Sequence, residues 1–235
     1  MSIFIIADLH LSFNENKPMN IFGEKWNNHS EKIKQNWKKN VKEHDLVVIP
    51  GDFSWAMHLK DTYEDFKFLN DLPGKKVLIK GNHDYWWTTL KSMKKFLDEN
   101  NFKNIDFIQN NSIIYDNIII CGTRGWTFLE SENSNKMINR ENDRLKLSLV
   151  DGITKHGTDK KIIVCMHYPP YLSNEKVETN KTLFIKTMKD FNVKDCFYGH
   201  LHGNSHKECL DGNIEGINMK LISADFLDFN PYKIL

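Results

Sequence analysis

The sequence has few of the residues that mark disulfide-rich, thiolate-metal or redox proteins. It contains only four cysteines in 235 residues, Cys121, Cys165, Cys196 and Cys209, and none of them forms a C-x-x-C pair. At least the first three lie in apolar, strand-like runs. We therefore expect buried free thiols and a reducing compartment, the cytoplasm.

Long apolar runs and an excess of charge are also missing. No segment approaches the ~18 consecutive apolar residues of a membrane span. The first ten residues, MSIFIIADLH, have no basic stretch before their short apolar run, so we expect a first strand and not a signal peptide. The formal net charge of +1 disfavours dedicated nucleic-acid binding, which normally needs a basic domain. We expect one soluble domain over residues 1–235, without a membrane partner.

Short apolar runs alternate with amphipathic segments along much of the chain. Helical spacing of apolar residues predicts helices over residues 31–44, 62–72, 89–100 and 139–153, the last with Asn139 as its N-cap. Residues 104–122 and 205–226 instead have the short runs and turn residues of a meander or hairpin. This pattern predicts a mixed α/β architecture packed in layers. The predicted strands are Ile3–Ala7, Leu46–Pro50, Val77–Ile79, Ile118–Cys121, Ile162–Met166 and Cys196–Tyr198.

Five of these strands end in residues that commonly bind metals. If the strands share a sheet, their carboxyl ends converge in one crevice. Two of the polar segments place candidate ligands two residues apart, so that in an extended segment both side chains point the same way. The five segments are Asp8-Leu9-His10, Gly51-Asp52, Gly81-Asn82-His83-Asp84, His167 and Gly199-His200-Leu201-His202.

The chemistry of these side chains favours a pair of metal ions. Carboxylate, amide and imidazole donors without a thiolate are typical of Mn²⁺, Fe or Zn²⁺ centres. Each segment alone is also typical of an ordinary turn, but the conjunction of five predicts a metal site. Seven donors exceed the needs of one tetrahedral ion. Two ions would use all of them, with Asp52 between both, Asp8, His10 and His202 on one, and Asn82, His167 and His200 on the other.

In this order the residues resemble the motif series of the calcineurin-like metallophosphoesterases, namely D-x-H, G-D, G-N-H-[DE], H and G-H-x-H. The resemblance runs from Asp8 to His202, and every motif is intact. It implies a four-layer α/β/β/α sandwich of two mixed β-sheets flanked by helices. It also implies two divalent or trivalent metal ions, with Mn or Fe favoured over Zn.

The resemblance further implies a phosphoric ester hydrolase. Similar enzymes cleave a phosphate mono- or diester by in-line attack of a metal-bridging hydroxide, with the histidine that corresponds to His83 assisting the leaving group. Asp84 has no assigned role, and orientation of the loop or of His83 is the simplest one. The expected substrate is a phosphorylated small molecule or a nucleotide.

The second motif departs from the G-D-x-x-D-R-G of the Ser/Thr protein phosphatases, because residues 51–57 read GDFSWAM. The acid that pairs with the catalytic histidine in those enzymes is therefore missing at that position, which disfavours a protein phosphatase. Two other functions are possible on the same fold. One is a non-catalytic metal-binding interaction module, although such descendants typically lose ligands. The other is a nuclease, which ordinarily needs a basic face.

Three residues outside the motifs are candidates for substrate contact. Arg124 follows the strand Ile118–Cys121, and a guanidinium can hold a phosphate through two hydrogen bonds. Trp126 could stack on a base or sugar, and Tyr168, next to His167, could form a wall of the pocket. A surface arginine and a core tryptophan are equally compatible with the sequence. For Trp86 and Trp87 we expect a place in the core.

Overall fold

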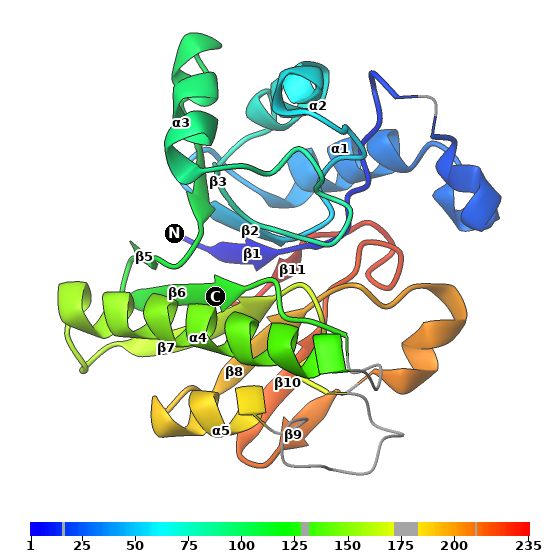
Figure 1. Cartoon of the computed structure of the whole chain (residues 1–235). Helices are drawn as coiled ribbons and strands as arrows, with labels where there is room; N and C mark the ends of the chain where they lie inside the picture. Colours follow the sequence, from blue (N-terminus) through cyan, green and yellow to red (C-terminus); the bar gives the residue numbers. More distant parts are fainter. Residues whose placement is uncertain (16, 128–131, 172–182, 210) are drawn as a thin grey trace.

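A computed structural model of the chain describes residues 1–15, 17–127, 132–171, 183–209 and 211–235. Two β-sheets face each other in the middle of the molecule, with helices on their outer sides (Figure 1). The predicted α/β/β/α sandwich is thus confirmed. The helices are α1 (His29–Asn40), α2 (Tyr63–Asn70), α3 (Leu90–Glu99), α4 (Glu132–His156) and α5 (Leu183–Asp190), with the short 3-10 helices η1 (Met19–Phe22), η2 (Glu24–Trp26), η3 (Leu59–Thr62) and η4 (Gly203–Glu208).

The first sheet has the strand order β11-β1-β2-β3-β4. Adjacent strands in it are parallel, except that the edge strand β11 is antiparallel to β1. The second has the order β5-β6-β7-β8-β10-β9, with antiparallel strands only at its two edges. The strands of the first sheet are β1 (Ile3–Ile5), β2 (Leu46–Pro50), β3 (Lys75–Ile79), β4 (Ile105–Ile108) and β11 (Tyr232–Lys233). Those of the second are β5 (Ile113–Tyr115), β6 (Ile118–Thr123), β7 (Lys161–Met166), β8 (Asp195–Tyr198), β9 (Gly212–Ile214) and β10 (Ile217–Leu221).

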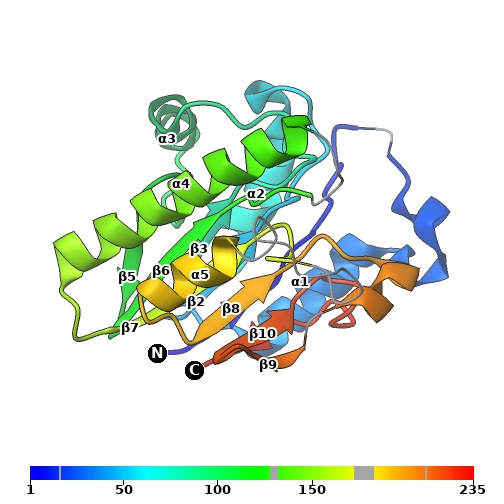
Figure 2. The ribbon, with the colours of Figure 1, turned by 60° about the horizontal axis from the view of Figure 1, so that its bottom comes forward.

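Three apolar cores separate the four layers. Alternate residues of a strand face opposite sides of a sheet, and in β1 Phe4 packs toward the helices α1–α3 while Ile3 and Ile5 pack between the sheets. On the other side, α4 and α5 lie across β6, β7 and β8 (Figure 2) and cover a separate core. Because the inner strands are covered on both faces, they read as continuous apolar runs in the sequence.

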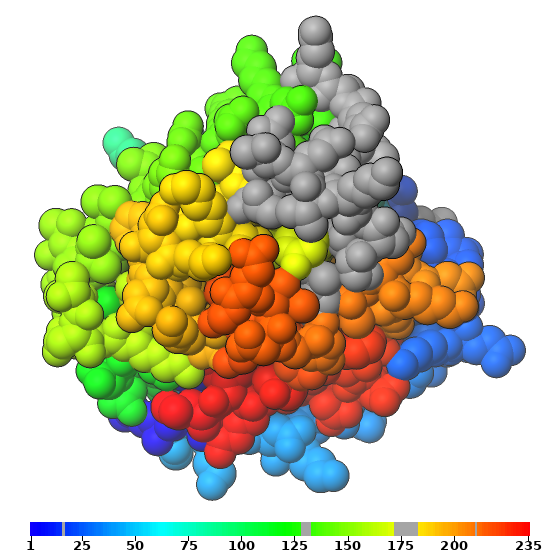
Figure 3. All heavy atoms as spheres, turned by 90° about the horizontal axis from the view of Figure 1, so that it is seen from below, coloured from blue at the N-terminus to red at the C-terminus, as the bar shows by residue number. Residues whose placement is uncertain are grey.

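The second sheet ends at one edge in the β9–β10 hairpin, which lies beside α5. The yellow atoms of α5 and the orange-red atoms of the hairpin lie next to each other in Figure 3. An ion pair of 3.1 Å between Lys189 Nζ of α5 and Glu215 Oε2 of the hairpin turn joins them. The antiparallel pairing of β9 and β10 confirms the hairpin predicted within residues 205–226.

One detail of the predicted elements is wrong. The helix expected over residues 139–153 begins at Glu132, so Asn139 is inside α4 and not its N-cap, and its side-chain amide donates to the Asn135 carbonyl. Of the meander or hairpin expected over residues 104–122, the hairpin is present as β5–β6 in the second sheet, while β4 belongs to the first sheet. The chain crosses between the sheets there.

Within the part of the chain that the structure describes, no helix combines the length and the apolarity needed to cross a bilayer.

Candidate metal centre

The carboxyl ends of strands from both sheets meet at one edge of the sandwich. β1, β2 and β3 of the first sheet precede Asp8, Asp52 and Asn82, whereas β7 and β8 of the second precede His167 and His200. The assumption that the five strands share one sheet is therefore wrong. The polar segments still converge, because the parallel strands of the two sheets run in the same direction, as the arrows of β1 and β6 show in Figure 1.

The ligand segments are curled and not extended, contrary to the sequence-based expectation. Asp8, His10, Asp52 and His200 have positive φ angles of 62°, 46°, 52° and 73°. Such left-handed conformations are costly for residues with a Cβ atom and cluster at functional sites. Backbone hydrogen bonds from Asp8 N to the Gly51 carbonyl, 3.0 Å, and from His10 N to the Asp52 carbonyl, 2.9 Å, hold the β1 and β2 tails together.

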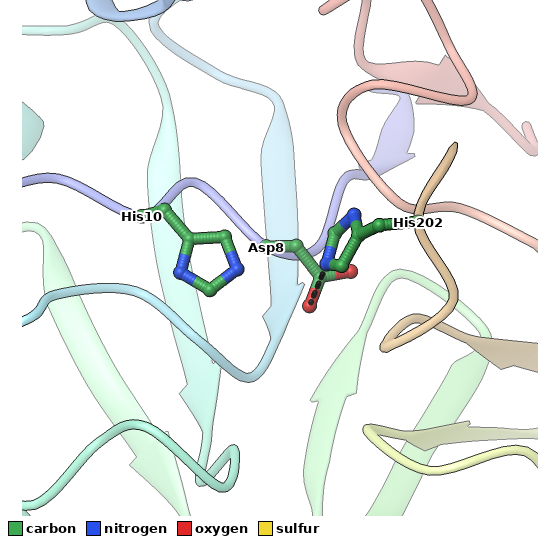
Figure 4. A group of neighbouring side chains, drawn as sticks. All are labelled: Asp8, His10 and His202. Atoms are coloured by element: carbon green, nitrogen blue, oxygen red, sulfur yellow. Dashed lines mark ion pairs between the residues drawn. The ribbon is translucent and has the colours of Figure 1, made fainter. Parts of the chain in front are cut away.

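Asp8, His10 and His202 form the first group of candidate ligands (Figure 4). His202 Nε2 lies 3.7 Å from Asp8 Oδ1, and neither of these buried atoms has a hydrogen-bond partner in the structure. The other Asp8 oxygen accepts a hydrogen bond of 3.0 Å from the backbone N–H of His200. One carboxylate oxygen is thus held by the protein, while the other faces an imidazole nitrogen at a distance too long for a hydrogen bond.

The second group comprises Asp8, Asp52 and His167, with Asn82 and His200 beside it. His167 Nε2 is 3.5 Å from Asp52 Oδ2 and 2.5 Å from Asn82 Oδ1. His200 Nδ1 lies 3.0 Å from the same amide oxygen. The structure therefore brings all seven predicted ligands together. Asp8 belongs to both groups, and Asp52 Oδ2 also lies 3.8 Å from His10 Nε2.

The spacing of these donors fits metal ions. Two donor atoms that each lie about 2.1 Å from one ion are at most about 4.2 Å apart. The pairs His202–Asp8, His167–Asp52 and His10–Asp52 have separations of 3.7, 3.5 and 3.8 Å. Buried polar atoms normally find hydrogen-bond partners, so the unpartnered Asp8 Oδ1 and His202 Nε2 are best explained by a cation between them.

Burial keeps two of the histidines ready to bind a cation. Desolvation lowers the pKa of His167 to about 3 and that of His200 to about 4, despite the opposing attraction of Asp8. Both imidazoles are therefore neutral at pH 7, as a metal ligand must be. Burial alone would raise the pKa of Asp8, but nearby imidazoles, His202 first, lower it well below its usual range.

Asp225 is a residue of this centre that the sequence analysis missed. Its Oδ1 lies 2.8 Å from His202 Nδ1 and its Oδ2 3.3 Å from His206 Nε2. A carboxylate on one imidazole nitrogen fixes the ring and leaves the other nitrogen for a metal. Its position could have indicated this role, because Asp225 follows the strand β10, which runs parallel to β8, just as the other candidate ligands follow strands.

His202 gives a measurable consequence of metal binding. Burial opposes its positive charge, but Asp8 and Asp225 outweigh burial and raise the pKa of His202 to about 10. The metal-free protein therefore carries a proton on His202 at pH 7.5, and this proton must leave before Nε2 can bind a cation. Burial, and then Asp84, also raise the pKa of Asp52 well above its usual value.

We expect about one proton to be released per chain when Mn²⁺ is added at pH 7.5, and Mn²⁺ affinity to rise with pH up to about 10. Calorimetric titrations in two buffers of different ionisation enthalpy measure this release. The variant Asp225→Asn removes one of the charges that raise the pKa of His202, so it should release fewer protons. Equal heats in both buffers would show that no proton is released, which would contradict the proposal that a protonated His202 becomes a metal ligand.

Asp84, whose role the sequence left open, holds two of the ligand loops together. Its buried carboxylate accepts five hydrogen bonds, from the backbone N–H groups of Gly81, Asp52, Phe53 and Ser54 and from the indole of Trp86. The donors belong to the segments after β2 and β3. Asp84 therefore fixes Asp52 and the Gly81–His83 segment relative to each other without facing the candidate metal positions itself.

Glycines allow the motif segments to pack this closely. A Cβ atom on Gly81 would overlap the Asp52 carboxylate, and one on Gly199 would lie 2.5 Å from Asp8 Oδ2. Both side chains are candidate ligands. The glycines before Asn82 and His200 are thus required by close approach at the centre.

His83 stands at the edge of the centre, beside an apolar cavity of about 220 Å³. Its ring centroid is 4.3 Å from that of Trp55, and its buried Nδ1 has no hydrogen-bond partner in the structure. The unpartnered Nδ1 agrees with the sequence, which lacks the acid that pairs with this histidine in the Ser/Thr protein phosphatases. Burial lowers the pKa of His83. Trp26, Met19 and Phe22 line the same cavity.

The other candidate residues divide into two sets. The Tyr168 ring lies 4.2 Å from the His200 ring, and its backbone N–H donates to the Arg124 carbonyl at 2.8 Å. The Arg124 guanidinium lies 4.4 Å from the centre of the Trp126 ring, so all three predicted substrate contacts lie on the His200 side of the centre. Trp86 and Trp87 are buried in the core, as expected.

The comparisons with known proteins agree with this geometry. The family model for calcineurin-like phosphoesterases matches residues 1–204. A phosphopantetheinyl hydrolase from Mycobacterium tuberculosis has a similar structure, with a TM-score of 0.53 and 12% identity over 100% of this chain and 95% of that chain. A protein of unknown function from Aquifex aeolicus is also similar, with a TM-score of 0.54 and 20% identity over 99% of this chain and 95% of the other.

No protein with a curated description matches the sequence. At these identities the two structures carry the fold alone, whereas the family model covers most of the chain, including all seven candidate ligands. The chain belongs to the calcineurin-like phosphoesterase family.

Proposed function

We propose that the protein hydrolyses a phosphate mono- or diester at a dinuclear metal centre. The observation that carries the proposal is the pair of ligand groups that share Asp8, together with the two unpartnered buried donor atoms of the first group, Asp8 Oδ1 and His202 Nε2. Family membership supports metal-dependent hydrolysis of phosphate esters. When bound, two cations supply positive charge that offsets charge on the phosphoryl group, and they lower the pKa of water.

The protein's own residues would hold and orient the reactants. In this proposal Asp8, His10, Asp52 and His202 bind one ion, and Asp52, Asn82, His167 and His200 bind the other. Mn or Fe is favoured because carboxylate and amide oxygens supply part of each ligand set beside the imidazole nitrogens. The backbone N–H of His83 donates 2.8 Å to Asp52 Oδ1, which fixes the position of His83 relative to the proposed bridging carboxylate.

His83 would protonate the leaving oxygen. Its Nδ1 has no partner in the structure, and an anionic phosphoryl group beside it favours the protonated imidazole. The cavity next to it is lined mainly by apolar and aromatic side chains, among them Trp26, Trp55, Met19 and Phe22. We therefore assign this cavity to the leaving alcohol, which makes an apolar or aromatic leaving group the best fit.

The test compares nitrophenyl phosphate and bis(nitrophenyl) phosphate. The protein is stripped of metal, assayed, reconstituted with Mn²⁺ and assayed again. Hydrolysis only after reconstitution supports the proposal, and the ratio of the two rates gives the preference for mono- or diesters. Absence of turnover with two bound ions per chain would favour a non-catalytic binding module. Salt-sensitive binding and cleavage of DNA would favour a nuclease.

Replacing His83 with asparagine should lower kcat by about 10²–10⁴ for alkyl esters, the usual contribution of general acid catalysis. The loss should be smaller for nitrophenyl esters, because nitrophenolate departs readily without a proton. Steady-state rates on both ester types measure the difference, and metal analysis of the variant is the control, since His83 is not a proposed ligand. An equal loss on both types would assign His83 to phosphoryl binding instead.

A further inference from the structure

A second cavity, of about 290 Å³, lies where β3 and β6 end against α4. It differs from the apolar cavity beside His83 in the charge of its walls. Lys80, Arg124 and Arg144 line it, against a single carboxylate, that of Glu141. These include two of the three arginines in the whole sequence.

Glu141 holds the two guanidinium groups in place. It is fully buried, accepts a hydrogen bond of 2.6 Å from Thr123 Oγ1, and pairs through Oε1 with Arg124 at 3.3 Å and Arg144 at 3.0 Å. One carboxylate balances only one of three cationic groups. The cavity therefore keeps an excess of positive charge in a partly desolvated place, where an anion is attracted more strongly than in water.

Donors remain free to meet such an anion. Arg124 Nε is buried and has no hydrogen-bond partner in the structure. Lys80 makes no ion pair among the residues that the structure describes, although it lines the same cavity as both arginines. Buried cationic donors are normally paired, so the unused Nε of Arg124 indicates a ligand of negative charge, and the half-buried Lys80 ammonium is available to the same ligand.

The cavity adjoins the candidate metal centre. Lys80 precedes the ligand Asn82 by two residues, so their Cα atoms are at most about 7.6 Å apart. On the other wall the Arg124 carbonyl accepts a hydrogen bond of 2.8 Å from the backbone of Tyr168, and the Tyr168 ring lies 4.2 Å from His200. A molecule of modest length can therefore occupy the metal centre and this cavity together.

We propose that the cavity lined by Lys80, Arg124 and Arg144 binds a second anionic group, a phosphate or carboxylate, of the substrate. The substrate class is then a phosphoester with a charged group some bonds away from the scissile phosphorus. This inference deepens the proposed function and rests on it for the identity of the bound molecule. The anion-binding cavity itself does not depend on hydrolysis.

Binding to the metal-free protein tests the cavity alone. Inorganic pyrophosphate is titrated into the wild-type protein by calorimetry, and then into Lys80→Gln and Arg144→Gln. We expect each variant to bind at least tenfold more weakly, since hydrogen bonds to charged groups are strong. Lys80→Gln leaves the contacts of Glu141 intact, which protects the test against a folding defect in Arg144→Gln. The matched control is Arg140→Gln, an exposed arginine of the same helix.

Substrate pairs then identify the source of the anion. With the Mn²⁺-loaded enzyme, kcat/KM is compared for ethyl and carboxyethyl nitrophenyl phosphate, or for propyl phosphate and propanediol bisphosphate if monoesters are the substrates. We expect the charged member to be preferred at least tenfold by wild type and Arg140→Gln. The preference should fall toward one in Lys80→Gln and Arg144→Gln.

The outcomes separate the two proposals. If pyrophosphate binds equally to wild type and both cavity variants, or not at all, the cavity assignment is overturned. If it binds at the cavity but neither substrate pair is discriminated, the anion is a separate effector and the substrate class is overturned. If no ester is hydrolysed while cavity binding persists, the proposed function fails and anion binding stands.

Discussion

Replacing Asp52 with asparagine should lower kcat/KM for the best nitrophenyl ester by about 10³ or more, because the charge that binds cations is lost. Asp52 Oδ2 lies 3.5 Å from His167 Nε2 and 3.8 Å from His10 Nε2, so it faces both ligand groups. Asparagine keeps the shape of the side chain. Its carbonyl can still accept the hydrogen bond from the His83 backbone, but its NH₂ group cannot bind a cation.

The same substitution should have the opposite effect on stability. Burial, and then repulsion by Asp84 and Asp8, raise the pKa of Asp52 well above its usual value. A carboxyl whose pKa is raised on folding lowers the stability of the folded state as the pH rises above its unfolded-state pKa, and the full loss is present above the folded-state pKa. In the metal-free protein at pH 8, Asp52→Asn should therefore melt at or above the wild-type temperature.

Metal binding should reverse the order of the two melting temperatures. Mn²⁺ that binds only the folded wild type raises its melting temperature by mass action, and Asp52→Asn should lose most of that increase. Thermal melts with and without Mn²⁺, combined with metal analysis, measure both effects. Asp98→Asn, an exposed carboxylate on α3, is the matched control. If Asp52→Asn kept two bound ions and wild-type turnover, Asp52 would not be a ligand of the metal centre.

The positions of the site residues could be predicted because parallel sheets gather strand ends. Apolar runs identified the inner strands, and the polar residues after them converge as expected. The division into two sheets could not be derived from periodicity, since inner strands of either sheet read as the same apolar runs. Only the resemblance of the motif series supplied the second sheet.

Local geometry was the least predictable part. The D-x-H and G-H-x-H segments suggested extended backbone, but Asp8 and His200 have positive φ angles of 62° and 73°. Tertiary hydrogen bonds from other segments hold these angles, and a local pattern does not contain them. Asp225 was missed for a related reason: its partner His202 is distant in sequence, and an aspartate after a strand also fits a turn.

Removal of the Asp84 carboxylate is expected to cause a large loss of stability. It is fully buried and accepts five hydrogen bonds, four of them from backbone N–H groups of the two ligand loops. Replacing it with alanine leaves those donors without an acceptor. We expect a destabilisation of about 3–5 kcal/mol, the upper range for single substitutions, and a fall in melting temperature of roughly 10 °C or more.

The substitution Asp84→Asn should fall between alanine and wild type, because one amide oxygen can still accept while the NH₂ group faces N–H donors. Measurement on the metal-free protein separates this effect from metal binding, since every hydrogen bond of Asp84 is within the protein. Asp98→Asn should change the melting temperature by no more than a surface substitution does. If Asp84→Ala unfolded like that control, the five hydrogen bonds would not hold the ligand loops. If it were strongly destabilised yet retained full metal affinity, Asp84 would stabilise the fold without positioning Asp52 and Asn82.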